Sequence, residues 1–184
     1  MKTLLIGGAR RGKSALAERW ALESGRRVTV IATAHEGDEE MAARIAAHRA
    51  QRPAGWATVE SPIALADGLR AADAPDALLL VDCLTLWLSN LLLAGMPQDT
   101  DLTAVGVLAP GALFDTERAA LLATLPGLQA ELILIGNEVG HGIVPLGALN
   151  RLFVDENGRL HQALAAQCEG VRFVMAGCTL ALKG

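Results

Sequence analysis

The chain reads Gly7-Gly8-Ala9-Arg10-Arg11-Gly12-Lys13-Ser14 directly after its first apolar run, Thr3 to Ile6. These eight residues fit the pattern G-x-x-x-x-G-K-[ST], whose glycines let backbone N–H groups converge on phosphate oxygens. The residues from Ser14 to Ser24 repeat apolar side chains at helical spacing, and Gly25 follows as a stop. A strand, this loop and a helix in succession predict a phosphate-binding loop.

Two side chains of the loop and one acid further along are predicted to serve a bound nucleotide. Lys13 is expected to reach the β and γ phosphates, and Ser14 to supply a hydroxyl to Mg²⁺. Asp82 follows the aliphatic run Leu78–Val81 and is expected at the strand's carboxyl end, where ligands of open α/β sheets bind. Asp82 is therefore a candidate metal ligand. The alternative is that it caps the helix predicted from Thr85.

The composition is that of one globular domain. The 184 residues are 52% hydrophobic and 20% charged, enough apolar material for a core without disulfides or a structural metal. A net charge of −4 and 3% aromatic residues disfavour a nucleic-acid partner, which needs a positive field and stacking surfaces. The three cysteines show no Cys-x-x-Cys pair, and no targeting segment is visible, so we expect a cytoplasmic protein.

Short aliphatic runs alternate with helical patterns, which predicts an α/β fold. We expect a P-loop NTPase-like single domain over residues 1–184, with a mostly parallel central sheet and helices on both faces. The predicted strands are Thr3–Ile6, Val28–Ala32, Leu78–Val81, Leu132–Ile135 and Val171–Met175, with weaker candidates at Trp56–Glu60 and Thr179–Leu182. The predicted helices after the first are Asp38–His48, Ile63–Ala71, Thr85–Leu93, Thr116–Leu125 and Leu149–Gln167.

Two stretches need a separate interpretation. Residues Ala77–Met96 are about long enough to span a bilayer, but Asp82 within them is costly in lipid, so a buried strand and a buried helix are predicted and no membrane span. Residues 95–113 contain Gly, Pro and polar side chains without a clear period. They predict a mobile surface excursion.

His48 and the segment 137–145 each allow two interpretations. His48 either binds the last carbonyls of its predicted helix or acts as a nucleophile on a nucleotide's α-phosphorus. The segment Asn137–Pro145 follows a predicted strand at the same sheet edge as the phosphate loop. Its glycines either permit a tight turn or form part of an acceptor pocket in which Glu138 accepts a proton or hydrogen bond.

The sequence resembles the bifunctional adenosylcobinamide kinase/adenosylcobinamide-phosphate guanylyltransferase family of cobalamin biosynthesis (the CobU/CobP family). The resemblance covers nearly the whole chain and is weakest from about Gly95 to Gln129. Its blocks are Gly7–Ser14 with Ala17-Glu18; Ile31-Ala32-Thr33, Asp38–His48, Arg52-Pro53, Trp56 and Glu60; Asn137–Gly140 with Gly142–Pro145; and Gly158-Arg159 with Gln162–Ala165. The phosphate loop is common to many enzymes, whereas the second and third blocks together are far more specific.

The resemblance implies two reactions in one site. The enzyme would phosphorylate adenosylcobinamide from ATP or GTP and then transfer GMP from GTP to adenosylcobinamide phosphate, with His48 as the guanylylated residue. Lys13 would be the second catalytic residue, and Ser14 and Asp82 the metal residues. A homotrimer is implied. The implied nucleotide-binding residues are Gly7, Gly8, Ala9, Arg10, Arg11, Gly12, Lys13, Ser14, Ala32, Thr33, Ala34, Arg49, Ala50, Gln51, Arg52, Glu60 and Asp82.

The chain departs from the family pattern at three positions. Arg11 stands where the family usually has Ser, so its charge lies near the phosphates or leans into solvent. Asp82 and Ala47 stand where relatives have Glu and a second His. Two other functions remain as alternatives: an ATP-only small-molecule P-loop kinase, and a regulatory P-loop nucleotide switch.

Overall fold

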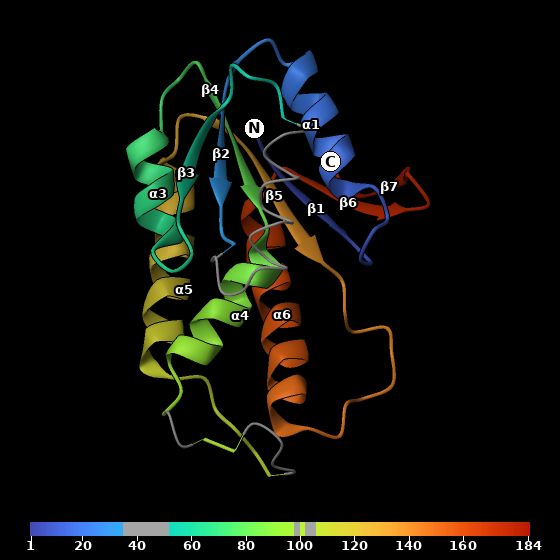
Figure 1. Ribbon diagram of the computed structural model, residues 1–184. Coiled ribbons are helices and arrows are strands. Elements are labelled where there is room, and N and C mark those ends of the chain that lie inside the picture. The colour runs from blue at the N-terminus through green and yellow to red at the C-terminus, as the bar shows by residue number, and fades with distance from the viewer. Residues whose placement is uncertain (35–51, 98–99, 102–105) are drawn as a thin grey trace.

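A single sheet runs through the computed structural model, which describes residues 1–34, 52–97, 100–101 and 106–184 (Figure 1). Among these residues seven strands pair in the order β3-β2-β4-β5-β1-β6-β7, all parallel except the last pair, β6 with β7. The strands are β1 Lys2–Gly7, β2 Arg27–Ala32, β3 Ala57–Glu60, β4 Ala77–Asp82, β5 Glu131–Asn137, β6 Gly170–Met175 and β7 Cys178–Lys183.

Helices cover both faces of this sheet, as predicted. The described helices are α1 Lys13–Glu23, α3 Leu65–Ala72, α4 Leu84–Ala94, α5 Ala112–Thr124 and α6 Ala148–Gln167, with a 3₁₀ turn at Leu125–Gly127. Helix α1 packs on one face, and α3, α4, α5 and α6 gather on the other (Figure 1). Each face therefore has its own hydrophobic core.

Side-chain alternation along the strands decides which residues belong to each core. In β4, Leu78 and Leu80 pack on the α1 face, whereas Leu79 and Val81 pack on the α4 face. In β5, Ile133 and Ile135 lie on the α1 face. Because successive side chains of a strand point to opposite faces, the residue two positions further along lies on the same face again. This rule places the polar residues at the strand ends.

The predicted strands are confirmed, including both weaker candidates. The segment Ala77–Met96 forms β4 and α4, and Trp87 of α4 is fully buried with its Nε1 donating to the Ile63 carbonyl at 2.6 Å. None of the described helices is long and apolar enough to cross a membrane. The predicted helix Asp38–His48 lies outside the described residues.

Predicted helix bounds differ from the observed ones by one or two residues elsewhere, but the start of one helix is wrong by four. Helix α5 begins at Ala112, not at Thr116, so the last two residues of the predicted 95–113 excursion are helical. The reason is Phe114, which is 1% exposed and packs into the core on that face, so burial of an aromatic ring fixes an early turn that periodicity missed. The part of the excursion at 98–99 and 102–105 lies outside the described residues.

Two helical glycines give opposite predictions for stability. A Cβ at Gly158 in α6 would meet nothing within 4 Å, whereas a Cβ at Gly68 in α3 would overlap the Ser61 hydroxyl. We expect Gly158→Ala to raise the free energy of unfolding by about 0.5–1 kcal/mol, because alanine favours the helix. Gly68→Ala should lower it. Urea unfolding of both variants checks the pair, and stabilisation by Gly68→Ala would contradict the described packing.

Candidate active site

The phosphate loop turns sharply between β1 and α1. Gly12, the residue before Lys13, has a φ of 95°, which a residue with a side chain rarely adopts. Gly7 lies so close to β6 that a Cβ would overlap the Val174 carbonyl oxygen. Residues 9–12 are exposed. The phosphate loop thus lies between β1 and the amino-terminal turn of α1, and its binding of phosphate stays a prediction.

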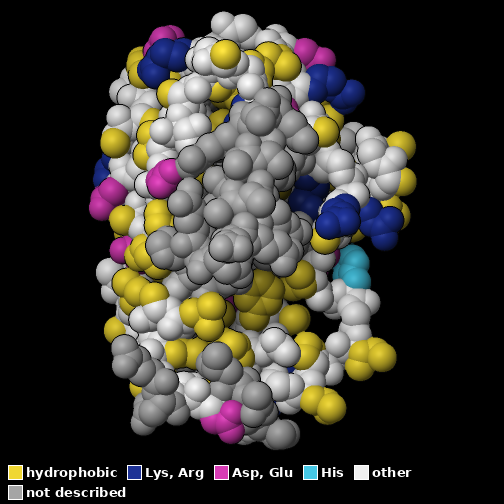
Figure 2. Space-filling view, viewed as in Figure 1, with side chains coloured by type: hydrophobic (Ala, Val, Ile, Leu, Met, Phe, Trp, Pro, Cys, Tyr) yellow, Lys and Arg dark blue, Asp and Glu magenta, His cyan; other side chains and the backbone are white. Residues whose placement is uncertain are grey.

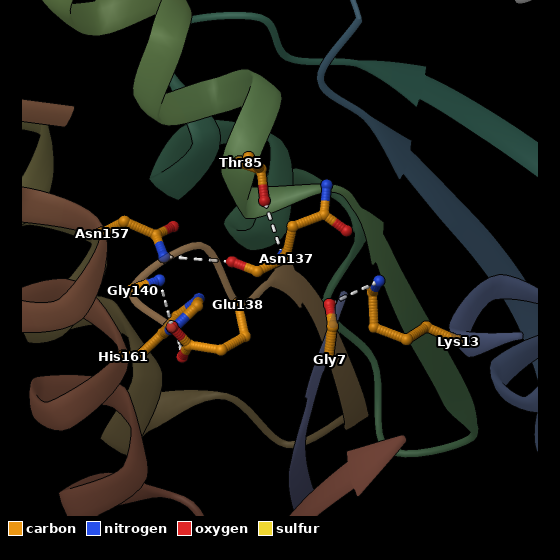
Figure 3. A network of polar contacts seen from close by, with 8 residues as sticks. All are labelled: Gly7, Lys13, Thr85, Asn137, Glu138, Gly140, Asn157 and His161. Atoms are coloured by element: carbon orange, nitrogen blue, oxygen red, sulfur yellow. Dashed lines mark hydrogen bonds and ion pairs between the residues drawn. The ribbon is translucent and has the colours of Figure 1, made fainter. Parts of the chain in front are cut away.

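Lys13 is folded inward against its own loop. Its side chain is buried, and Nζ donates hydrogen bonds of 2.8 Å to the carbonyl oxygens of Gly7 and Gly8 (Figure 3). Burial lowers the pKa of the Lys13 ammonium, while the nearby Cys83 and Asp82 raise it. The Lys13 ammonium is therefore held inside its own loop. Phosphate oxygens of a triphosphate could replace the Gly7 and Gly8 carbonyls as its hydrogen-bond acceptors.

Asp82 occupies the same sheet edge. It continues the alternation of Leu78 and Leu80, so it lies on the α1 face at the end of β4. Its Oδ2 is 3.6 Å from Nη2 of Arg52, and both side chains are largely buried, at 16% and 9% exposure. Helix α4 begins at Leu84 with Cys83 as the N-cap residue and no side-chain cap. Asp82 therefore lies one position before the N-cap residue, and its role as a metal ligand stays a prediction.

The predicted nucleotide-binding segment Ala32–Ala34 is tied to the end of β4. Ala32 pairs with Asp82 and with Glu60, so these three residues lie at one edge of neighbouring strands. The Thr33 hydroxyl donates to the Cys83 carbonyl at 2.7 Å and accepts from the Cys83 N–H at 2.9 Å. Thr33 is fully buried, so its side chain serves this junction.

The residues present fit a magnesium ion. Ser14, in the first turn of α1, offers a hydroxyl, and Asp82 offers a carboxylate; both are hard oxygen ligands. The described part of the chain contains no group of three or more His, Cys, Asp and Glu that could hold a metal. A site with so few protein ligands suits Mg²⁺, which keeps several waters and binds substrate phosphates.

A polar network at the end of β5 adjoins the phosphate loop (Figure 3). The Glu138 N–H donates to the Gly7 carbonyl at 3.0 Å, the same carbonyl that Lys13 contacts. Helix α4 supplies Thr85, whose Oγ1 accepts from the Asn137 N–H at 2.7 Å. Helix α6 supplies Asn157, whose Nδ2 donates to the Asn137 carbonyl at 3.0 Å. The backbone at Asn137 is thus held from both sides.

The Glu138 carboxylate points toward α6, away from Lys13 (Figure 3). Its Oε1 accepts from the Gly140 N–H at 2.6 Å, and its Oε2 is 4.0 Å from Nδ1 of His161. His161 is 6% exposed, and its ring fills the space that a side chain at Gly136 would need. Burial lowers the pKa of His161, and Glu138 opposes this shift. The imidazole is therefore a buried, neutral neighbour of the carboxylate at neutral pH.

Sequence reasoning missed most of this network. It named Glu138 but treated His161 as structural and did not single out Thr85 or Asn157. A signal was present, because Asn157 and His161 are four residues apart in the helix and so share a face with Leu160 and Leu164. Residues 140 and 141 form a turn, and neither Gly140 nor Gly142 has a positive φ, so the turn does not require glycine for its backbone angles. The segment after them exposes Ile143, Val144 and Leu146.

Basic residues surround the loop. Figure 2 shows Lys and Arg side chains gathered on the side where Figure 1 places residues 8–12. Arg10 and Arg11 are exposed, and the Arg11 side chain lies back over Gly8, which keeps its charge near the loop. The Arg11 carbonyl accepts from the Gly177 N–H at 3.1 Å. The turn between β6 and β7 therefore supports the loop from outside.

Four predicted site residues remain untested by geometry. His48, Arg49, Ala50 and Gln51 lie outside the described residues. A cavity of about 430 Å³ lies elsewhere, lined by Thr3, Trp20, Leu78 and Ile133 among others, on the α1 face near the amino ends of the strands. Because parallel strands share one carboxyl edge, this cavity is at the opposite end from the phosphate loop.

The fold and the loop place the chain among the P-loop nucleotide-binding proteins. Two ATPases of type III secretion systems share the fold, one described as prototypical and the other as EscN of enteropathogenic E. coli. Their TM-scores are 0.57 and 0.55 at 11% identity, covering 98% and 95% of this chain. The match spans 57% and 43% of those chains, so it describes the fold alone.

The sequence comparison is more specific. Residues 3–182 match the family described as cobinamide kinase / cobinamide phosphate guanyltransferase. A Pseudomonas aeruginosa protein named bifunctional adenosylcobalamin biosynthesis protein CobP is 53% identical over 184 residues, covering 100% of this chain and 98% of the relative. The Salmonella typhimurium protein named CobU is 40% identical, with full coverage of both. The chain belongs to this family and is thus a kinase and guanylyltransferase.

The buried His161 predicts a pH dependence of stability. Because its pKa is lowered in the folded state, the unfolded state binds more protons as the pH falls through the ordinary histidine range, and stability falls with it. We expect the free energy of unfolding to drop more between pH 7.5 and pH 5 in the wild type than in His161→Leu. Urea unfolding at both pH values measures the difference. The exposed His141→Leu is the control and should keep the wild-type slope; equal slopes in all three proteins would contradict the expectation.

Proposed function

We propose that the enzyme phosphorylates adenosylcobinamide and then transfers GMP from GTP to adenosylcobinamide phosphate, giving adenosylcobinamide-GDP and pyrophosphate through a GMP–histidine intermediate at His48. The observation that carries this proposal is the family match over residues 3–182 together with Lys13 and Asp82 at one sheet edge. The relatives named as bifunctional adenosylcobalamin biosynthesis proteins support the same pathway.

In the kinase step the protein acts by positioning and electrostatics. The acceptor's hydroxyl oxygen forms a bond to the γ-phosphorus and loses its proton to solvent, the bond from that phosphorus to the bridging oxygen breaks, and the nucleoside diphosphate leaves. Lys13 exchanges the Gly7 and Gly8 carbonyls for phosphate oxygens and stabilises their charge. Ser14 and Asp82 would hold Mg²⁺, which supplies further charge neutralisation when bound.

In the guanylyl step His48 would displace pyrophosphate from the α-phosphorus, and the phosphate of the acceptor would then attack the phosphoramidate. The chain on either side of residues 35–51 supports this role. Thr33 donates a hydrogen bond to the Cys83 carbonyl, and Nη2 of Arg52 lies 3.6 Å from Oδ2 of Asp82. His48 precedes Arg52 by four residues, a span of at most about 14 Å. The Arg52 guanidinium would compensate charge on the phosphates.

The acceptor would dock beside the segment 137–147. Within this segment the Glu138 N–H donates a hydrogen bond to the Gly7 carbonyl, and the exposed Ile143, Val144 and Leu146 would contact an amphiphilic macrocycle. The family resemblance further supports a homotrimer in the cytoplasm. Either ATP or GTP can supply the first phosphate, because the loop serves phosphates common to both nucleotides.

Labelling tests the covalent step. Incubation with α-labelled GTP and Mg²⁺ should leave label on the protein that acid releases and alkali does not, as a histidine phosphoramidate requires. His48→Ala should carry no label, whereas His141→Ala should label like the wild type. Guanylyl transfer by His48→Ala at the wild-type rate would overturn the role of His48.

The same assay separates the two alternative functions. An ATP-only kinase would transfer γ-phosphoryl to an acceptor without any protein-bound GMP. A regulatory switch would bind a partner according to its nucleotide and turn over no corrinoid. Running the assay with and without adenosylcobinamide phosphate distinguishes these outcomes, because only the proposed enzyme loses its label when that acceptor is added.

A second prediction concerns the metal. Ser14→Ala removes the hydroxyl ligand, so the Mg²⁺ concentration needed for half-maximal GTP binding should rise at least about tenfold. Ser14→Thr keeps the hydroxyl and should stay near the wild-type value. Titration of Mg²⁺ at fixed GTP, followed by calorimetry, measures both variants, with Ser24→Ala as the control. An unchanged Mg²⁺ requirement in Ser14→Ala would remove Ser14 from the site.

A further inference from the structure

The position of Asn137 in the sheet is the first observation. Strand β5 lies between β1, which leads into the phosphate loop, and β4, which ends at Asp82. Asn137 pairs with Gly7, and Asp82 pairs with Ile135, two residues before it. The carboxyl end of β5 therefore lies between the phosphate loop, which would bind the β and γ phosphates, and Asp82, which would hold the metal.

The face on which Asn137 lies is the second observation. Ile133 and Ile135 pack on the α1 face, so alternation puts the Asn137 side chain on that face too. This is the face of Asp82 and of the first turn of α1. Figure 3 agrees, with the Asn137 amide on the side of β5 where Gly7 and Lys13 lie and the Glu138 carboxylate on the other. An amide thus faces the phosphate loop.

The third observation is that the backbone of Asn137 is held while its side-chain amide is not. Thr85 and Asn157 fix the backbone N–H and carbonyl of Asn137 from two helices, at 2.7 Å and 3.0 Å. No hydrogen bond joins the side-chain amide to another described residue. Asparagine is disfavoured in strands, and an amide with two N–H donors on a fixed backbone, on the side of β5 where the Lys13 ammonium lies, suits an anionic ligand.

We propose that Asn137 recognises the γ-phosphate, its Nδ2 donating a hydrogen bond to a γ-phosphate oxygen of the bound triphosphate. This role rests on the nucleotide site of the proposed function and adds a residue to it. Because the amide is uncharged, it does not neutralise Asp82 and takes up no proton. As the γ-phosphorus leaves its bridging oxygen for the acceptor oxygen, the same donor follows the charge on the equatorial oxygens. Asn137 is therefore a catalytic residue of the kinase step.

The experiment compares a triphosphate with a diphosphate on the full chain. Calorimetry with Mg²⁺ and the β,γ-imido analogue of GTP, and separately with GDP, gives two dissociation constants for each variant. For Asn137→Ala we expect the triphosphate constant to rise about tenfold, the worth of one charge-assisted hydrogen bond, and the GDP constant to change less than twofold. Asn137→Asp, which keeps the shape and adds a negative charge, should weaken triphosphate binding further while leaving GDP binding closer to the wild type.

Controls separate recognition from structure. Asn150→Ala, an exposed position on α6, should leave both constants unchanged. Thermal unfolding of each variant checks folding, and Asn137→Asp serves if Asn137→Ala does not fold. Parallel weakening of both nucleotides, or unchanged triphosphate binding, overturns the role of Asn137. A different result would overturn the guanylyl step alone: the wild type carries no protein-bound GMP, while Asn137→Ala still weakens triphosphate binding and leaves GDP binding unchanged. The two failures are therefore distinguishable.

Discussion

The carbonyl oxygen of Gly7 accepts two hydrogen bonds, one from the Lys13 ammonium and one from the Glu138 N–H. Through this single acceptor the loop after β1 is joined to the loop after β5, and helix α1 is joined to the network that α4 and α6 build. Strand β1 lies inside the sheet, with β5 on one side and β6 on the other. Close approach of β6 leaves no room for a side chain at this position, so glycine is required.

The two faces of the sheet carry different groups at this edge. On one face α1 brings its amino-terminal turn to the carboxyl edge of the sheet, together with Asp82 and Asn137. On the other face α6 holds the backbone of β5 in place through Asn157 and fills the space at Gly136 with His161. The alternation of side chains along β4 and β5 therefore decides which residues face α1 and which face the helices on the other side.

Much of this could be predicted from the sequence, because the decisive signals are local. The strands are unbroken aliphatic runs, and the phosphate loop is a contiguous motif between two of the clearest elements. The metal role of Asp82 stays a prediction, although the structure shows that Cys83, and not Asp82, is the N-cap residue of α4. Helix α5 begins four residues before the start that apolar periodicity predicts, because Phe114 is buried in the core. Thr85, Asn157 and His161 meet only through tertiary packing, and the aliphatic residues on both faces of β5 hid the alternation that orients Asn137. The role of His48 stays a prediction from resemblance.

The support that Gly177 gives to the Arg11 carbonyl has a bearing on the order of folding. The eight residues of the phosphate loop are contiguous in the sequence, but the strands on either side of β1 are β5 and β6, and the turn that contacts the loop lies between β6 and β7. Contacts between segments that are distant in the sequence carry the larger entropy of loop closure. We therefore expect the phosphate loop to acquire its shape late in folding, after β1 has paired with both neighbours.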